Sequence, residues 1–539
     1  MKKTLLTLLI AILSAGASAT SISDVWVSDL GNGQFKNPVI YADYSDPDVC
    51  KVGDAYIMTA SSFNCVPGLP LLRSYDLVNW ELIGYALNKL QPEDHFALPQ
   101  HGGGVWAPSI RYNNKKLYIY WGDPDFGIYM ISASQVEGPW SEPILVKAGK
   151  GLIDPSPLWD SNGKAYLSFA LAGSRAGLKS VLLVAEMHPE GTHLLSDARI
   201  VFDGHKEHET IEGTKFYKRN GYYYILAPAG GVATGWQVAL RAKNPFGPFE
   251  IKTVMHQGST HINGPHQGGW VHTDAGEDWF LHFQDVGVVG RIVHLNPVKW
   301  IEDWPVMGNA PKDSFTGVPL RTADKPKVVR TVDVVTPPEN DEFTAAQMGV
   351  QWQWHANPSH TYAYYNPLDG GWLRLYSVPK PDAYVSLWSI PNLYLQKLPA
   401  PVFTATTKLR FEPNTGIQGE RAGFVLMGRS YAMISIEQTS AGLVVSQIAC
   451  ERADRGGKET VHASEPLNQN DLYIRMRFTN GEKAQFSYSL DGTDFVEFGP
   501  VFQALEGQWI GAKMGFFCSR EEKTNDAGWL DVDWIRITP

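Results

Sequence analysis

A short turn that leads into a strand recurs five times between residues 46 and 267 of the chain. The turns begin at Asp46, Ala107, Asp154, Glu212 and Gly264, so successive turns lie 61, 47, 58 and 52 residues apart. An aromatic-rich strand follows each turn, and these strands are expected at residues 54–58, 116–120, 164–167, 221–225 and 277–281. A period of about 50 residues with several strands per unit is typical of a β-propeller. Five repeats predict five blades over residues 34–320.

The remainder of the chain favours a second domain that is also built of strands. The 51 Gly, 35 Pro and 64 aromatic residues (18 Trp, 23 Tyr and 23 Phe) are typical of many short strands joined by tight turns. Residues 321–338 are rich in Lys, Arg, Val and Pro, which predicts a linker. Beyond it, Asn480-Gly481 and Asp491-Gly492 are strong hairpin turns on either side of the alternating segment 484–490. We therefore predict an all-β protein, a five-bladed β-propeller followed by a β-sandwich over residues 339–539.

The first 19 residues have the pattern of an export signal. Lys2 and Lys3 precede an apolar stretch at 5–13, and Ala17-Ser18-Ala19 forms a small-residue cleavage site. Its removal would leave 44 basic against 56 acidic side chains, a net charge of −12. This acidic balance argues against nucleic acid or an anionic membrane as a partner. We expect an exported protein, in the periplasm or secreted.

Four cysteines remain after the signal, at positions 50, 65, 450 and 518. No two have the Cys-x-x-Cys spacing of a zinc site. Export would permit Cys50–Cys65 and Cys450–Cys518 bridges, whereas buried free thiols are the simpler interpretation. The sequence leaves both alternatives open.

Three of the five repeated turns contain a carboxylate, Asp46, Asp154 and Glu212. Equivalent positions at the start of the innermost strands of a propeller converge on its axis, so we expect these side chains to share one pocket. Any one of them alone is better explained as a turn residue that caps the backbone. Three together favour glycoside hydrolysis, which needs a proton donor and a base or nucleophile on opposite faces of a sugar.

Several further motifs surround these carboxylates: residues 37–40 and 46–48, Thr59-Ala60-Ser61-Ser62-Phe63, and the segments 104–108, 153–156 and 211–213. In these motifs the sequence resembles the family 43 glycoside hydrolases. It implies a five-bladed propeller and inverting hydrolysis of β-D-xylosidic or α-L-arabinofuranosidic bonds, with no cofactor needed for the chemistry. Thr214 is a departure, because many members carry Pro there.

The resemblance also implies roles for individual residues. Asp46 matches the general base, Glu212 the general acid, and Asp154 the acid that orients Glu212 and adjusts its pKa. Phe63 and Trp106 are expected to contact the sugar, although core packing is the commoner place for an aromatic ring. Arg291 matches an arginine that reaches sugar hydroxyls, with a structural salt bridge as the alternative.

Two calcium sites are weaker expectations. The family often has an axial calcium ion held by one histidine and water, which would place it at His266, although a structural histidine is the alternative. Asp341 and Asp533 could bind a second, structural calcium where the chain ends meet, whereas solvation at the surface is the simpler explanation.

The second half resembles the concanavalin-like accessory domain of β-xylosidases and α-L-arabinofuranosidases, through residues 341–343, 351–354 and 531–534. Such a domain either packs against the propeller or closes one side of the active-site mouth, which would favour attack at chain ends. We thus expect an exo-acting inverting hydrolase that releases α-L-arabinofuranosyl units from plant hemicellulose oligosaccharides. A β-D-xylosidase is the alternative, and an endo-arabinan hydrolase or a non-catalytic sugar-binding propeller is less favoured. Linkage and oligomeric state stay open.

Overall fold

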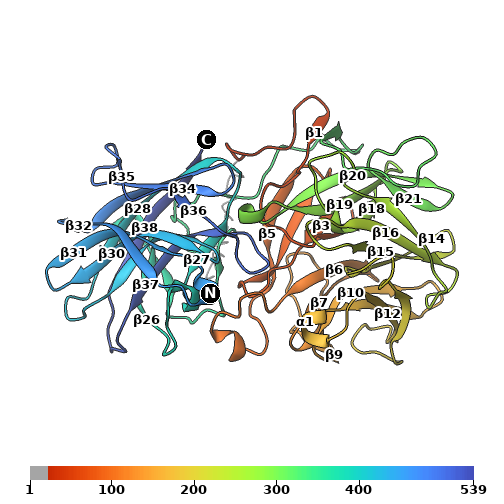
Figure 1. Ribbon diagram of the computed structural model, residues 1–539, viewed down its shortest axis with the longest axis horizontal. Helices are drawn as coiled ribbons and strands as arrows, with labels where there is room; N and C mark the ends of the chain where they lie inside the picture. Colours follow the sequence, from red (N-terminus) through yellow and green to blue (C-terminus); the bar gives the residue numbers. More distant parts are fainter. Residues whose placement is uncertain (1–21) are drawn as a thin grey trace, which may run out of the picture.

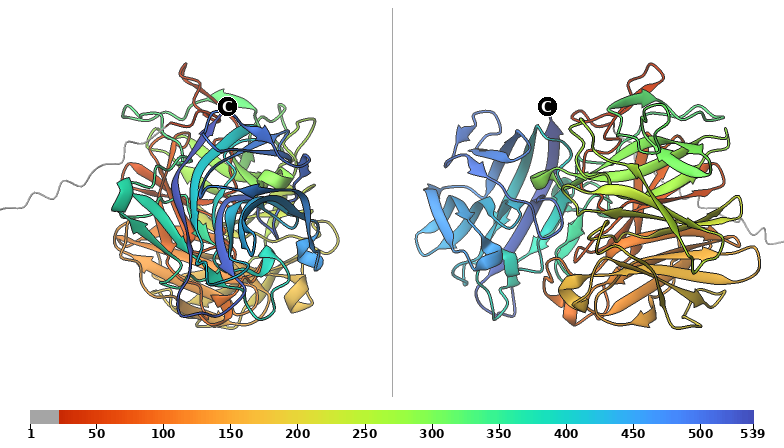
Figure 2. Two further views of the ribbon diagram at one scale, coloured as in Figure 1. Left: turned by 90° about the vertical axis from the view of Figure 1, so that its left-hand side faces the viewer. Right: turned by 45° about the vertical axis from the view of Figure 1, so that its right-hand side comes forward.

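The computed structural model describes residues 22–539, so the expected export signal lies outside the described residues. The described chain is built almost wholly of strands in two halves that lie side by side (Figures 1 and 2). The first half contains five four-stranded antiparallel sheets and the second contains two eight-stranded sheets. The predicted all-β fold, a five-bladed propeller followed by a β-sandwich, is confirmed. Within residues 22–539, no helix is long and apolar enough to cross a membrane.

Each propeller blade is a sheet whose four strands pair in chain order. The first blade contains β2 (Asp48–Val52), β3 (Ala55–Thr59), β4 (Gly68–Ser74) and β5 (Trp80–Leu87), and the second contains β6 (Trp106–Asn113), β7 (Lys116–Asp123), β8 (Gly127–Ala133) and β9 (Ile144–Ala148). The third contains β10 (Leu152–Trp159), β11 (Ala165–Leu171), β12 (Val181–Met187) and β13 (Arg199–Asp203). The fourth contains β14 (Lys215–Arg219), β15 (Tyr222–Ala229), β16 (Trp236–Ala242) and β17 (Glu250–Met255), and the fifth contains β18 (His266–His272), β19 (Asp278–Asp285), β20 (Arg291–Ile301) and β21 (Trp304–Met307).

The first strands of the blades lie innermost, as the repeat predicts. β18 contacts β2, β2 contacts β6, β6 contacts β10, and β10 contacts β14. The ring is closed by the segment before β2, because the side chain of Asn37 accepts from the Leu295 N–H and donates to the carbonyls of Leu295 and Leu320. The predicted linker begins with β22 (Thr322–Asp324), which pairs with β1 (Gln34–Lys36) and so belongs to this closure.

The sandwich packs its two sheets over a shared apolar core. One sheet has the order β23 (Gln353–Trp354), β27 (Tyr394–Lys397), β37 (Lys513–Arg520), β29 (Arg421–Met427), β30 (Tyr431–Thr439), β31 (Gly442–Cys450) and β32 (Glu459–Leu467), with β26 (Val378–Pro379) paired to β37. The other has the order β24 (Ala363–Asn366), β25 (Trp372–Tyr376), β38 (Trp529–Thr538), β28 (Phe403–Glu412), β33 (Asp471–Thr479), β34 (Lys483–Ser489) and β35 (Val496–Glu497), with β36 (Phe502–Gln503) paired to β34. The helical segments are α1 (Gly173–Ala176) and the 3-10 turns His95–Ala97, Gly287–Val289, Leu368–Gly370, Leu387–Ser389 and Ala453–Arg455.

The two domains are joined by backbone hydrogen bonds as well as by apolar packing. Val66 and Trp354 exchange both of their N–H to O=C bonds, at 3.0 and 2.6 Å. The propeller residues Val288, Val289 and Ile292 belong to the same apolar cluster as the sandwich core. All four cysteines are free and buried, so the bridges that export would permit are not formed.

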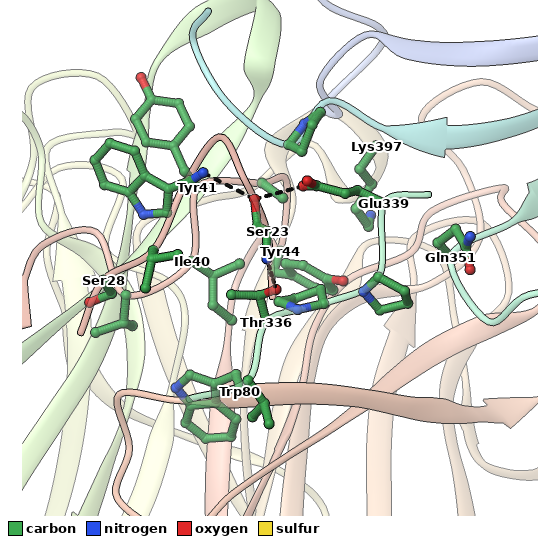
Figure 3. Close-up of a pocket in the computed structure, with 18 of the residues that line it drawn as sticks. Ser23, Ser28, Ile40, Tyr41, Tyr44, Trp80, Thr336, Glu339, Gln351 and Lys397 are labelled. Atoms are coloured by element: carbon green, nitrogen blue, oxygen red, sulfur yellow. Dashed lines mark hydrogen bonds between the residues drawn. The ribbon is translucent and has the colours of Figure 1, made fainter. Parts of the chain in front are cut away.

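The chain before β1 adds a third connection at the same junction (Figure 3). Ser23 donates its hydroxyl to Glu339 at 2.9 Å, and the Ser23 N–H donates to the Thr336 hydroxyl oxygen at 2.9 Å. These bonds tie the first described residues to the segment that leads into the sandwich. We expect the two domains to unfold together, because each would lose buried partners without the other.

Candidate active site

The three repeated carboxylates line one cavity of about 710 Å³ at the propeller axis. Asp46 and Asp154 adopt left-handed backbone conformations, with φ of 54° and 56°. Aspartate tolerates this region better than most residues, and strained backbone of this kind is often found at functional sites. Glu212 precedes Gly213, where φ is 64° and a Cβ atom would lie 2.6 Å from Pro228. The turn chemistry therefore aims all three side chains into the same space.

Asp46 is buried and held by two hydroxyl groups. Ser61 and Ser45 donate to its Oδ2, at 2.5 and 3.0 Å. Its Oδ1 lies 3.6 Å from Nη1 of Arg291, which also donates to the Ser45 hydroxyl at 2.6 Å. These contacts fix the carboxylate in position on the cavity wall.

Glu212 and Asp154 are the two carboxyl groups whose ionisation the site perturbs most. Burial is the main cause that raises the pKa of Glu212 from 4.5 to about 8; repulsion from Asp154 and Asp46 adds to it, and Arg291 opposes it. Burial also raises the pKa of Asp154 to about 7. The Gly213 N–H, which donates to its Oδ2 at 2.6 Å, opposes this rise. Because the two groups interact, their protons leave in two steps that belong to the pair and not to either residue alone. Glu212 thus keeps its proton at neutral pH, although 23% of its side chain is exposed in the cavity.

The aromatic residues and the arginine expected from the sequence lie on the wall of the same cavity. Phe63 and Trp106 meet edge to face with ring centroids 6.3 Å apart, and the Trp106 indole donates to the Gly102 carbonyl. Arg291 lies over the Phe283 ring at 5.0 Å. The three residues expected to contact the sugar therefore all line this cavity.

Sequence reasoning missed Trp509, which reaches the cavity from the sandwich domain. It lies in the connection between β36 and β37, its φ is 65°, and 48% of its surface is exposed. Its ring meets Trp106 edge to face at 6.2 Å. Gln267, whose side chain bonds Asp154, was also missed, although its neighbour His266 was identified from the fifth turn. The sandwich therefore forms part of the mouth of the cavity.

The two expected calcium sites have different surroundings. His266 is fully buried on the cavity wall, burial lowers its pKa to about 3, and neither ring nitrogen has a hydrogen-bond partner among the described residues. A neutral imidazole with a free nitrogen fits a site that takes one protein ligand and water for the rest. Asp341 and Asp533 instead already have protein partners, because Asp341 accepts from Trp352 and Phe343 and Asp533 pairs with Lys408. In residues 22–539, no three His, Cys, Asp or Glu side chains gather as metal ligands.

Both halves of the chain match the sequence models of known protein families. Residues 35–305 match the sequence model of the glycosyl hydrolases family 43, and residues 340–538 match the β-xylosidase C-terminal concanavalin A-like domain. A putative β-xylosidase of Xylanibacter ruminicola is 36% identical over 493 residues, which cover 90% of this chain and 86% of that protein. A non-reducing end α-L-arabinofuranosidase of Bacteroides ovatus is 30% identical over 425 residues, 75% of each chain.

The whole chain also has the fold of a solved relative. The crystal structure of a xylan β-1,4-xylosidase from Bacillus halodurans superposes with a TM-score of 0.80, covering 94% of this chain and all of that one. The identity of 22% makes this a likeness of fold. It extends across both domains, so the pairing of propeller and sandwich is common to the two proteins.

Proposed function

Since the chain belongs to glycosyl hydrolase family 43, we propose that it releases single β-D-xylosyl units from the ends of xylan-derived oligosaccharides with inversion at the anomeric carbon. The observation that carries this proposal is the cavity shared by Asp46, Asp154 and Glu212. A non-catalytic sugar-binding propeller would have no use for three carboxyl groups at its axis. The preference for xylose rests on the relative that is 36% identical and named a putative β-xylosidase.

In the proposed reaction, Asp46 is the general base and Glu212 the general acid. Glu212 is protonated at neutral pH because burial raises its pKa to about 8, so it can give its proton to the departing sugar oxygen. Asp46, held by Ser45 and Ser61, takes a proton from a water on the opposite face of the ring. The water attacks the anomeric carbon while the bond from this carbon to the leaving-group oxygen breaks. This single displacement inverts the configuration of the anomeric carbon.

Asp154 is a positioning residue in this scheme. Its carboxylate accepts from the Gly213 N–H, directly after Glu212 in the chain, and so fixes the turn that carries the acid. Its charge also helps to keep Glu212 protonated. Phe63, Trp106 and Arg291 contact the sugar bound between the acid and the base.

Release of α-L-arabinofuranosyl units, the first expectation from the sequence, is the second candidate. The relative that is 30% identical and named a non-reducing end α-L-arabinofuranosidase favours it. The same acid and base serve both sugars, because the two candidates differ in ring size and not in the displacement itself. Trp509 supports attack at chain ends in either case, since it narrows the mouth of the cavity from the sandwich side.

Two further parts of the proposal come from the sequence. The signal-like pattern of residues 1–19 supports export to the periplasm or out of the cell. The chemistry needs only carboxyl groups and water, and a calcium ion at His266 would serve the structure of the axis.

Incubation with a panel of nitrophenyl glycosides, xylobiose and arabinosylated xylo-oligosaccharides, followed by product analysis, tests the proposal. Xylose as the first product from xylobiose and from nitrophenyl β-D-xyloside is the expected result. Arabinose alone would select the second candidate, and the absence of any released pentose would reject both. Asp46→Asn serves as the control for contaminating glycosidases.

A further inference from the structure

A second cavity, of about 400 Å³, lies on the sandwich domain and shares no residue with the active-site cavity. It is lined by Tyr364 on β24, Tyr376 on β25, Arg520 at the end of β37 and the connection 524–527 before β38. Its volume is in the range that holds small ligands in proteins. We propose that this cavity is a second carbohydrate site, which holds an internal segment of a neutral xylan chain without cleaving it.

An ordered aromatic wall is the first observation that supports this site. The rings of Tyr364 and Tyr376 meet edge to face, 6.2 Å apart at 77°. Tyr376 in turn packs on the edge of Trp529, and the Arg374 guanidinium lies 4.4 Å from the centre of the Trp529 ring. This packing fixes Tyr376, whereas Tyr364 remains 49% exposed. An exposed ring braced from behind offers a rigid apolar face to the C–H side of a sugar.

An ion pair fixes the aromatic packing behind that wall. Both nitrogens of the Arg374 fork donate to Asp531, each at 2.7 Å. A bidentate pair of this kind gives a fixed geometry at little entropic cost. The wall is therefore present before any ligand binds, which reduces the entropy lost on binding.

Arg520 supplies the polar part of the cavity. Only 8% of its surface is exposed, and its Nε donates to the Glu522 carbonyl at 3.0 Å. In the described chain its two Nη atoms have no hydrogen-bond partner, although the side chain lines the cavity. These donors on the cavity wall are available to the hydroxyl oxygens of a sugar, which accept hydrogen bonds.

Asp526 supplies a hydrogen-bond acceptor to the same cavity. Asp526 uses Oδ1 to accept from the Ala527 N–H at 2.9 Å, which leaves Oδ2 to accept from a ligand. Donor and acceptor together match the hydroxyls of a sugar, each of which both donates and accepts. The charged residues that line the cavity are Arg520 and Asp526, which have opposite signs, and the buried carboxylate of Glu420 also acts on Arg520. A neutral chain therefore suits the cavity better than an anion does. The choice of xylan among neutral chains rests on the proposed function.

Such a site would help an enzyme that attacks chain ends. Internal segments far outnumber ends on a polymer, so holding a segment raises the local concentration of ends near the active site. Removing the site should therefore raise KM for xylan and long oligosaccharides and leave the hydrolysis of a small nitrophenyl glycoside unchanged.

Affinity electrophoresis of the full chain in native gels with and without soluble neutral xylan tests this proposal. Glu212→Gln serves as the parent, so that the gel is not digested. Retardation by xylan is expected for the parent, a roughly tenfold weaker retardation for Tyr364→Ala, and near-parental retardation for Tyr364→Phe, which keeps the ring. Tyr112→Ala is the matched control, because Tyr112 is 41% exposed on β6 and lines neither cavity.

Three results would overturn the second site, and the first two are no retardation of the parent by xylan and equal retardation of the parent and Tyr364→Ala. Loss of retardation in Tyr112→Ala as well would also overturn it, because the effect would then not belong to this cavity. Failure of the proposed function is seen separately, as the absence of xylose release from xylobiose by the wild-type enzyme. Tyr364→Ala in the otherwise wild-type, active enzyme gives the second readout, because its KM should rise for xylan and stay unchanged for xylobiose.

Discussion

Removal of the charge at Asp154 should move the alkaline limb of the profile of kcat/KM against pH to lower pH. The pKa of Glu212 is raised from 4.5 to about 8, mainly by burial and then by Asp154 and Asp46. Asp154 lies close to Glu212, because its Oδ2 is 2.6 Å from the Gly213 nitrogen. At an effective dielectric constant of about 20, two charges about 8 Å apart repel by about 2 kcal/mol. This energy corresponds to a pKa change of about 1.5.

The sign follows from the role of the acid. Activity that needs a protonated Glu212 is lost as the pH rises through its pKa, so the wild-type limb should lie near 8 with xylobiose as substrate. Asp154→Asn removes the repulsion while the amide oxygen can still accept from Gly213, and the limb should fall to between about 6.5 and 7. The limb should also sharpen to a single ionisation, because the coupled partner is gone.

The assay is kcat/KM for xylobiose between about pH 5 and 9.5, since a sugar leaving group needs the proton. Each variant is checked by circular dichroism and by its unfolding temperature at pH 6. Asp154→Asn is expected to be slower at every pH, so the midpoint of the limb and not the rate carries the result. An unmoved limb, or a limb at higher pH, would refute the electrostatic reasoning.

Three other outcomes are expected. Proton NMR of the first sugar released from a nitrophenyl β-D-xyloside should show the α anomer, and initial β-xylose would make Asp46 a nucleophile instead of a base. Trp509→Ala should lower kcat/KM for xylobiose about tenfold and hardly change the unfolding temperature, because the ring is half exposed at the cavity mouth. Unchanged kinetics would show that the sandwich domain contributes nothing to the active site. Glu212→Gln should gain stability over the wild type as the pH rises from about 5 to 8, by about 3–4 kcal/mol, because the raised pKa makes ionisation of the folded state costly. Thermal unfolding at pH 5, 7 and 9 checks the last outcome, and a constant difference would contradict it.

The propeller and the convergence of its carboxylates could be predicted because both follow from a repeat. A blade of about 50 residues leaves a period in the chain, and equivalent positions of a closed ring must meet at its axis. Asp46, Asp154 and Glu212 could therefore be placed together although 166 residues separate the first from the last. The turn residues added local support, since aspartate and glycine tolerate the left-handed backbone that these turns adopt.

The contribution of the sandwich could not be predicted in the same way. Trp509 lies about 300 residues after the last carboxylate, in a connection that belongs to no repeat. Its place depends on how two domains dock, which is decided by contacts such as the Val66–Trp354 pairing and the apolar cluster around Val288. Contacts between domains leave no period in the sequence. Similarly, the free donors of Arg520 are visible only once its burial and partners are known.

The most direct test of the central claim, that Glu212 is the acid and Asp46 the base, is the dependence of each variant on its leaving group. Rates of Glu212→Gln and Asp46→Asn are measured with xylobiose and with a nitrophenyl β-D-xyloside, whose leaving group hardly needs a proton. Glu212→Gln should lose about 10²–10⁴-fold with xylobiose and retain much of its activity on the nitrophenyl glycoside, whereas Asp46→Asn should lose activity on both. Equal losses for Glu212→Gln on the two substrates, or survival of Asp46→Asn on the activated one, would contradict the assignment.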